Sequence, residues 1–211
     1  MARFAPSRVH FGDRPPSDEF EDDGTGLPTP IRTKAAARRT AGIREAKQVL
    51  EHLPGPGESL HCVVTARLDL TDVLNALIES AGPCEAMRIA TLGFNERNLR
   101  VMLDWLDSGR VKSLALVASI FFRSHKAELW ERTLAEFRQR NQRAACCHSH
   151  AKVVALDFAD GRAFSIEGSA NLCGNGSGRE QFALFDDPAL AVWHRGWIDE
   201  LIGRHGETPS K

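Results

Sequence analysis

The 211 residues suffice for one medium-sized domain with an appendage, and 42% hydrophobic with 26% charged residues is an ordinary balance for a globular protein. A formal net charge of −1 excludes a polycation, so nucleic acid could be bound only through a local basic patch. No run approaches the ~20 apolar residues that a membrane span needs.

Two further features of the sequence predict a cytoplasmic protein. Residues 1–16 lack the apolar segment of a secretory signal. The cysteines are odd in number and lack the spacing of a disulfide framework, so we interpret them as reduced thiols. They are Cys62, Cys84, Cys146, Cys147 and Cys173.

The N-terminal region is predicted to stand apart from the main domain. Residues 1–32 are rich in Pro, Gly, Asp and Arg without periodicity, which is typical of a disordered tail. Residues 33–53 place apolar side chains at helical spacing, and the following Pro-Gly-Pro-Gly ends this predicted helix. We therefore assign residues 33–56 to an N-terminal helix and linker. The helix packs on its own domain or docks to a protein partner or second subunit.

Strands and helices alternate in the main domain, predicted to span residues 57–206, with a short tail at 207–211. Strands are predicted at 60–65, 86–94 and 111–122, each followed by a helix whose cap is Asp69 or Thr71, Asn95 and Ser124 respectively. The pattern then changes to strands at 147–158, 162–167 and 182–185, with a turn at Asp160-Gly161 and a last helix from Asp187-Pro188. This order predicts an α/β fold with a mixed, mostly parallel sheet and helices on both faces.

The segment between residues 150 and 180 is the most informative about chemistry. His150 and Lys152, two apart on a predicted strand, would point to the same side of the sheet and pair a nucleophile with a cation. Ser169 and Asn171 then offer hydrogen-bond donors, and Glu180 offers an acid. Such a group suits attack on phosphorus, where negative charge builds on the non-bridging oxygens.

The order H-x-K-x4-D, then G-S-x-N, then a later Glu resembles the HKD signature of the phospholipase D superfamily. The resemblance covers about residues 59–204 and implies the phospholipase D-like fold. The chain holds one copy of the motif. Small bacterial nucleases of this superfamily also have one copy and assemble the active site from two subunits, so the resemblance implies a homodimer. The chemistry of the superfamily requires no metal and no other cofactor.

The resemblance implies a role for each catalytic residue. His150 would attack phosphorus and form a phosphohistidine, and His150 of the partner subunit would act as the acid and base. Lys152 and Asn171 would hold the non-bridging oxygens, and Ser169 would buttress the site. Glu180 would orient the nucleophilic histidine and support its cationic form.

Two other motif residues are predicted to be structural. Asp157 has the opposite strand parity to His150, so it should point away from the phosphate. Gly168 permits a close approach of the backbone. The G-S-x-N lies further from the H-x-K than is often seen in the superfamily, and the hairpin at Asp160-Gly161 accounts for the extra residues.

A zinc site is the rival interpretation of the run Cys146-Cys147-His148-Ser149-His150, because cysteine and histidine clusters bind zinc. Adjacent strand residues point to opposite faces, and no second C-x2-C pair completes four ligands. We therefore predict no metal.

Nucleic acid, either DNA or RNA, is the predicted substrate. Basic side chains near the motif would hold its phosphate backbone. They are Arg138, Arg140, Arg143 and Arg179. The first three could equally pair with glutamates on the same helix. The chain has no tyrosine and few aromatic residues predicted to be exposed, so base stacking is poorly supported.

Two alternative functions stay open. One is a phospholipid phosphodiesterase or phosphatidyltransferase. The other is a non-catalytic subunit that binds nucleic acid or a partner in a restriction, repair or defence assembly, with the N-terminal region available to a partner.

Overall fold

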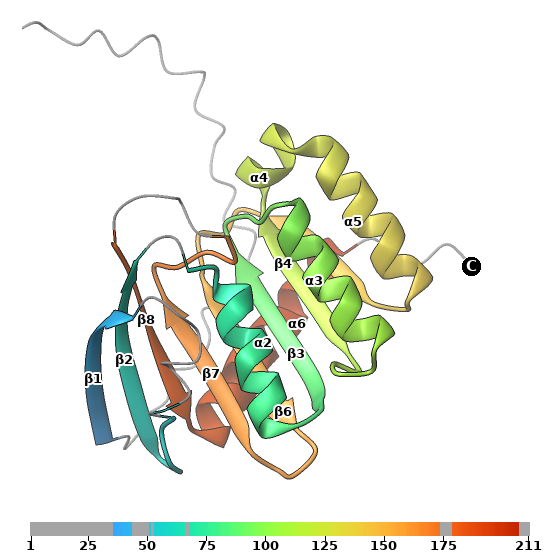
Figure 1. Cartoon of the computed structure of the whole chain (residues 1–211). Helices are drawn as coiled ribbons and strands as arrows, with labels where there is room; N and C mark the ends of the chain where they lie inside the picture. The colour runs from blue at the N-terminus through green and yellow to red at the C-terminus, as the bar shows by residue number, and fades with distance from the viewer. Residues whose placement is uncertain (1–35, 44–50, 52, 66–67, 174–178, 207–211) are drawn as a thin grey trace, which may run out of the picture.

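A computed structural model of the chain describes residues 36–43, 51, 53–65, 68–173 and 179–206. Within these residues one sheet has the strand order β1-β2-β8-β7-β6-β3-β4-β5 (Figure 1). Its strands are β1 (Ala36–Ile43), β2 (Glu58–Thr65), β3 (Cys84–Thr91), β4 (Leu114–Ser119), β5 (Arg143–Cys147), β6 (Val153–Phe158), β7 (Ala163–Gly168) and β8 (Arg179–Asp186). The helices are α2 (Leu70–Ala81), α3 (Glu96–Asp107), α4 (Ile120–His125), α5 (Ala127–Gln139) and α6 (Pro188–His205).

The sheet is mixed, but the prediction of a mostly parallel sheet is wrong. Neighbours β1–β2, β3–β4 and β4–β5 are parallel, whereas β2–β8, β8–β7, β7–β6 and β6–β3 are antiparallel. The cause is the second half of the chain, where β6, β7 and β8 follow one another without helical crossovers and each strand reverses the direction of the one before it.

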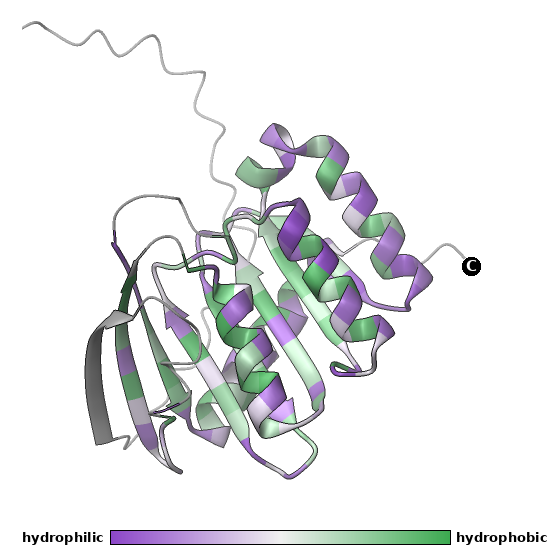
Figure 2. Cartoon of the chain, in the orientation of Figure 1, coloured by the Kyte–Doolittle hydropathy of each residue, from purple (hydrophilic) through white to green (hydrophobic). Residues whose placement is uncertain are grey.

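Helices cover both faces of the sheet, as predicted. Alternate residues of β4 divide between two cores: Leu114 and Leu116 pack with α2, α3 and α5, whereas Ala115 and Val117 pack with α6. Helices α2, α3 and α5 lie in front of the sheet in Figure 1 and α6 lies behind it. Strands β3 and β4 are mainly hydrophobic in colour in Figure 2, as expected where both faces are covered.

The N-terminal helix predicted over residues 33–53 is wrong in part, because residues 36–43 form strand β1. This strand pairs in parallel with β2, from Ala36 opposite Glu58 onward. The backbone N–H and C=O groups along the outer edge of β2 need partners, and β1 supplies them. Residues 44–50 of the predicted helix and both predicted tails, 1–32 and 207–211, lie outside the described residues.

The strand predicted over 111–122 ends earlier, at Ser119. The Ser119 hydroxyl accepts a hydrogen bond from the backbone N–H of Phe121 (3.2 Å), which starts the short helix α4. Ser124, the predicted cap of the following helix, lies inside α4 and donates to the carbonyl oxygen of Ile120 (3.0 Å). The earlier break matters because it turns Phe121 away from the sheet.

None of the helices in the described ranges combines the length and apolar character needed to cross a membrane.

All five cysteines lie among the described residues and are free thiols. Burial raises the pKa of Cys62 and of Cys84 to about 12, so both stay protonated near neutral pH and are poor nucleophiles. We expect iodoacetamide to spare Cys62 and Cys84 in the native protein and to modify both in guanidinium, as read by peptide mass spectrometry. Rapid labelling of either thiol in the native protein would contradict this description of the core.

Candidate active site

The predicted catalytic residues meet at one edge of the sheet. His150 and Lys152 precede β6, Ser169 and Asn171 follow β7, and Glu180 is the second residue of β8. Since β7 is antiparallel to both β6 and β8, the end of β7 lies beside the beginnings of the other two strands. Strands β3, β4 and β5 also end at this edge, because Ala90 pairs with Val153 and Ser119 pairs with Cys147. We call it the motif edge.

The prediction that His150 and Lys152 lie on a strand is wrong, because residues 148–152 form a connection between β5 and β6. This connection passes the ends of β4 and β3, three strand spacings or ~14 Å in all. His150 is the middle residue and its side chain is exposed. This connection therefore places His150 over the ends of the central strands. A position within a strand would instead have put its side chain on one face of the sheet.

Lys152 is held next to His150 by a hydrogen bond to the backbone. Its Nζ donates to the His150 carbonyl oxygen (3.0 Å), and the side chain is half-buried. The backbone N–H of Ala151 donates to the Ser149 hydroxyl (3.2 Å) within the same connection. The histidine and the ammonium group thus belong to one short, internally bonded segment.

Ser169 ties the turn after β7 to Glu180. Its hydroxyl donates to the Glu180 carboxylate and accepts from the backbone N–H of Gln181 (3.1 Å). The Ser169 backbone N–H donates to the Gln181 carbonyl oxygen (2.9 Å). These bonds hold the carboxylate of Glu180 at the motif edge.

Gly168, the last residue of β7, lies in close contact with the backbone of β8. A Cβ at this position would lie 2.2 Å from the Gln181 carbonyl oxygen and 2.6 Å from the Phe182 Cα. Both obstacles are backbone atoms, which cannot move aside without separating the strands. Glycine is therefore required at position 168.

We expect Gly168→Ala to destabilise the fold by about 2–3 kcal/mol, the scale of an overpacked interior, as measured by denaturant unfolding. Gly203→Ala is the matched control, because a Cβ there has nothing within 4 Å. Equal stability of the two variants would contradict the close contact of β7 and β8.

Asn171 lies next to Leu172, whose backbone carbonyl is hydrogen-bonded to α3. The buried Asn98 amide donates to the carbonyl oxygen of Leu172 (3.3 Å) and to the Thr71 hydroxyl (3.0 Å). Among the described residues, the buried Oδ1 of Asn171 has no hydrogen-bond partner. The backbone next to Asn171 is thus tied to α2 and α3, and the Oδ1 of Asn171 remains available as an acceptor.

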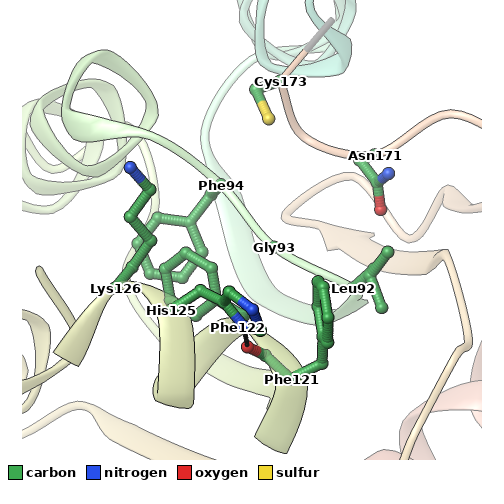
Figure 3. Close-up of a pocket in the computed structure, with 9 residues that line it drawn as sticks. All are labelled: Leu92, Gly93, Phe94, Phe121, Phe122, His125, Lys126, Asn171 and Cys173. Atoms are coloured by element: carbon green, nitrogen blue, oxygen red, sulfur yellow. Dashed lines mark hydrogen bonds between the residues drawn. The ribbon is translucent and has the colours of Figure 1, made fainter. Parts of the chain in front are cut away.

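Beside the motif edge, Asn171 also lines a cavity of about 230 Å³. Its walls are Leu92, Gly93, Phe94, Phe121, Phe122, His125, Lys126, Asn171 and Cys173. In Figure 3, Asn171 and Cys173 lie across the cavity from Phe122 and Lys126. Sequence reasoning missed this cavity because residues 121 and 122 were assigned to a strand. The mixture of aromatic and basic residues in Phe-Phe-Arg-Ser-His-Lys was the available signal.

Of the basic residues predicted near the motif, three lie at the opposite end of β5: Arg138, Arg140 and Arg143. Arg143 is the first residue of β5 and the motif begins after the last, about 13 Å further along the strand. Arg138 and Arg140 precede β5 and lie towards the same remote end.

The arginines at that end are engaged in ion pairs. Arg140 bonds Asp107 (2.7 Å) and Glu136 (2.6 Å), and Arg143 bonds Asp199 (3.2 Å). The alternative of pairing within the helix therefore holds for Arg140 and Glu136. Arg179, the first residue of β8, does lie at the motif edge and is exposed.

Asp157 and the cysteine run have structural surroundings. The Asp157 carboxylate pairs with Arg195 of α6, away from the motif edge. Cys147 packs in the core under α6, whereas Cys146 packs against the core of the other face. Within the described residues, no three His, Cys, Asp or Glu side chains form a group that could hold a metal ion.

No protein-family model matches the sequence, and no curated protein matches it. Solved structures do match it. Nuc from Salmonella typhimurium, a phospholipase D family member, superposes with a TM-score of 0.51 at 14% identity, over 71% of this chain and 97% of that one. NucT from Helicobacter pylori gives 0.51 at 15% identity, over 72% and 100%. A phosphatidylserine synthase from Haemophilus influenzae Rd KW20 gives 0.50 at 14% identity, over 76% and 44%.

Proposed function

We propose that this chain, whose fold is that of the phospholipase D superfamily, is a metal-independent phosphodiesterase that cleaves DNA or RNA. One observation carries the proposal: His150, Lys152, Ser169, Asn171 and Glu180 come from three separate segments and meet at the motif edge. Packing does not explain this arrangement, because His150 is exposed in a connection between strands and is not part of the core.

The proposed reaction has two steps on one phosphorus atom. An imidazole nitrogen of His150 attacks phosphorus, the P–N bond forms, and the P–O bond to the leaving group breaks. His150 of the partner subunit gives its proton to the leaving oxygen. Water then attacks the phosphohistidine, passes its proton to that second imidazole, and releases the first.

The other residues at the motif edge stabilise charge and position groups. Lys152 and Asn171 donate to the non-bridging oxygens, whose charge grows in the transition state. Glu180, held by Ser169, orients the histidine and stabilises its cationic form. In a symmetric dimer each motif edge contributes one complete set, so the shared site contains two copies of His150.

Exposed cations at the motif edge support nucleic acid as the substrate. Arg123 and Lys126 belong to α4 and the residue after it, and Arg179 begins β8. None of these three cations is bound to a carboxylate in a described ion pair, in contrast to Arg140 and Arg143. A polyanionic backbone that enters the site would pass these side chains.

A lipid phosphodiester is the second candidate, and the apolar lining of the cavity next to Asn171 favours it. Both candidates share the same chemistry at phosphorus and differ in what the phosphodiester carries.

The test is cleavage of single- and double-stranded DNA and RNA and of phospholipid vesicles, each in excess EDTA, with His150→Ala in parallel. We expect nucleic acid to be cleaved in EDTA by the wild type and left intact by the variant. Cleavage only of phospholipid would replace nucleic acid with the second candidate. Cleavage that requires a divalent metal, or that survives in His150→Ala, would overturn the proposed mechanism.

A further inference from the structure

The cavity beside Asn171 has an aromatic wall that the cleavage chemistry leaves unused. Phe94 and Phe122 stack with ring centroids 4.4 Å apart and form its inner side. Gly93 allows this packing, since a Cβ there would lie 2.8 Å from the Phe122 ring. Phe121 forms the outer side and is 60% exposed, more than any other large hydrophobic side chain in the described part of the chain.

Phe121 is held as a flat platform at the mouth of this cavity. Its ring lies 4.1 Å from the ring of His125, centroid to centroid, at an interplanar angle of 37°. The His125 Nδ1 donates to the Phe121 carbonyl oxygen (2.8 Å), which fixes the histidine ring beneath it (Figure 3). Because the aromatic surface is already ordered, a flat ligand would stack on it at little conformational cost.

Two exposed cations of the described chain lie at or near the cavity. Lys126 lines it and is exposed, and Arg123 lies one turn earlier on the exposed side of α4. Asn171 stands on the opposite wall and also belongs to the proposed catalytic set. A ligand in the cavity would thus have an apolar flat part between the walls and an anionic part at the rim, towards the motif edge.

The size of the cavity restricts the flat part to one ring system. A volume of about 230 Å³ is below the range of drug-sized pockets, ~300–1,000 Å³. A base within a duplex could not reach the cavity without leaving its stack.

From these contacts we infer that the cavity binds one nucleobase of a single-stranded nucleic acid, stacked on Phe121, next to the phosphodiester that is cleaved. This inference rests on the proposed function and specifies its substrate as single-stranded. It adds one stacked base to the phosphate-backbone contacts that the sequence predicts.

The first test is binding of a short single-stranded oligonucleotide, measured by fluorescence anisotropy in the His150→Ala background so that no cleavage occurs. Phe121→Ala should weaken binding about 10- to 100-fold, the range for removal of one stacking platform. Phe121→Trp should restore it, whereas Phe121→Leu, apolar but not flat, should not. Val192→Ala is the control, because Val192 is 52% exposed on α6, on the other face of the sheet.

The second test asks whether a base is the group that Phe121 contacts. A series of oligonucleotides carries a single abasic nucleotide, at a different position in each. We expect the abasic nucleotide to weaken binding at one of these positions. At that position it should have no further effect in Phe121→Ala, because the same contact is already lost. An abasic effect that is equal in both proteins would place the base elsewhere and overturn the inference.

The outcomes separate this inference from the proposed function. If nucleic acid is cleaved but Phe121→Ala binds like Val192→Ala, the inference fails and the proposed function stands. If phospholipid alone is bound or cleaved, and Phe121→Leu works as well as the wild type, the cavity holds an acyl chain and both proposals fail. Preference for duplex over single strand would also overturn the inference.

Discussion

His150→Ala is expected to abolish phosphodiester cleavage, lowering kcat by roughly 10⁴-fold or more, the scale for loss of a covalent nucleophile. In a symmetric dimer the substitution removes both the nucleophile and the acid from every site, so no residual route through phosphohistidine exists. The exposed position of His150 in the connection between β5 and β6 means that the fold should be unaffected. The measurement is single-turnover cleavage, with circular dichroism and thermal unfolding as checks on the fold.

His148→Ala is the matched control for this result. His148 is exposed two residues earlier in the same connection and has no proposed role in the chemistry. It should retain cleavage, whereas loss of activity in both variants would point to a disturbed connection rather than a lost nucleophile. A covalent adduct between a labelled oligonucleotide and the wild type, absent in His150→Ala, would identify the intermediate directly.

Lys152→Ala should lower kcat by about 10²- to 10³-fold, or ~3–4 kcal/mol, as does removal of one donor to a developing oxyanion. The charge on the non-bridging oxygens grows in the transition state, so kcat should fall more than KM rises. Lys152→Met, which keeps the length of the side chain and removes its charge, should be equally impaired. Steady-state kinetics on the nucleic-acid substrate measure both effects.

Lys152 also bonds the carbonyl oxygen of His150, so a structural effect must be separated from a chemical one. Lys152→Arg keeps a cation and a donor, and it should regain part of the activity if the charge is what matters. Lys112→Met is the control for loss of a lysine charge, because Lys112 pairs with Glu85 at the end of the sheet remote from the motif. Unchanged kcat in Lys152→Met would remove Lys152 from the proposed reaction.

Three local signals in the sequence were accurate, whereas the predicted cap at Ser124 was not. Asn95 caps α3 with a reciprocal hydrogen bond to Asn98, and Asp187 caps α6 ahead of Pro188. Gly161 has a φ of 87°, the left-handed conformation that the predicted Asp160-Gly161 turn requires. Such features depend on two to four consecutive residues, so the sequence alone contains the information.

Signals that depended on a periodic pattern were less reliable. The apolar spacing over residues 33–53 predicted a helix, yet residues 36–43 pair with β2 because the edge of that strand needed a partner. The strand predicted through residue 122 placed Phe121 in the sheet, whereas the structure places it in α4. A short apolar segment can form either a helix or a strand, and its tertiary contacts decide which of the two it adopts.

The sequence by itself determined which chemical groups this protein has and the order in which they occur: a histidine, a lysine, a serine, an asparagine and a glutamate at spacings suited to phosphoryl transfer. Only the tertiary structure decided where they meet. The direction of each strand brings Ser169 beside Glu180, and the crossing over β4 and β3 presents His150. The same pairing carries Arg140 and Arg143 away from the motif into ion pairs. These outcomes follow from the free energy of pairing strands and burying surface between residues distant in the chain, which no local pattern encodes.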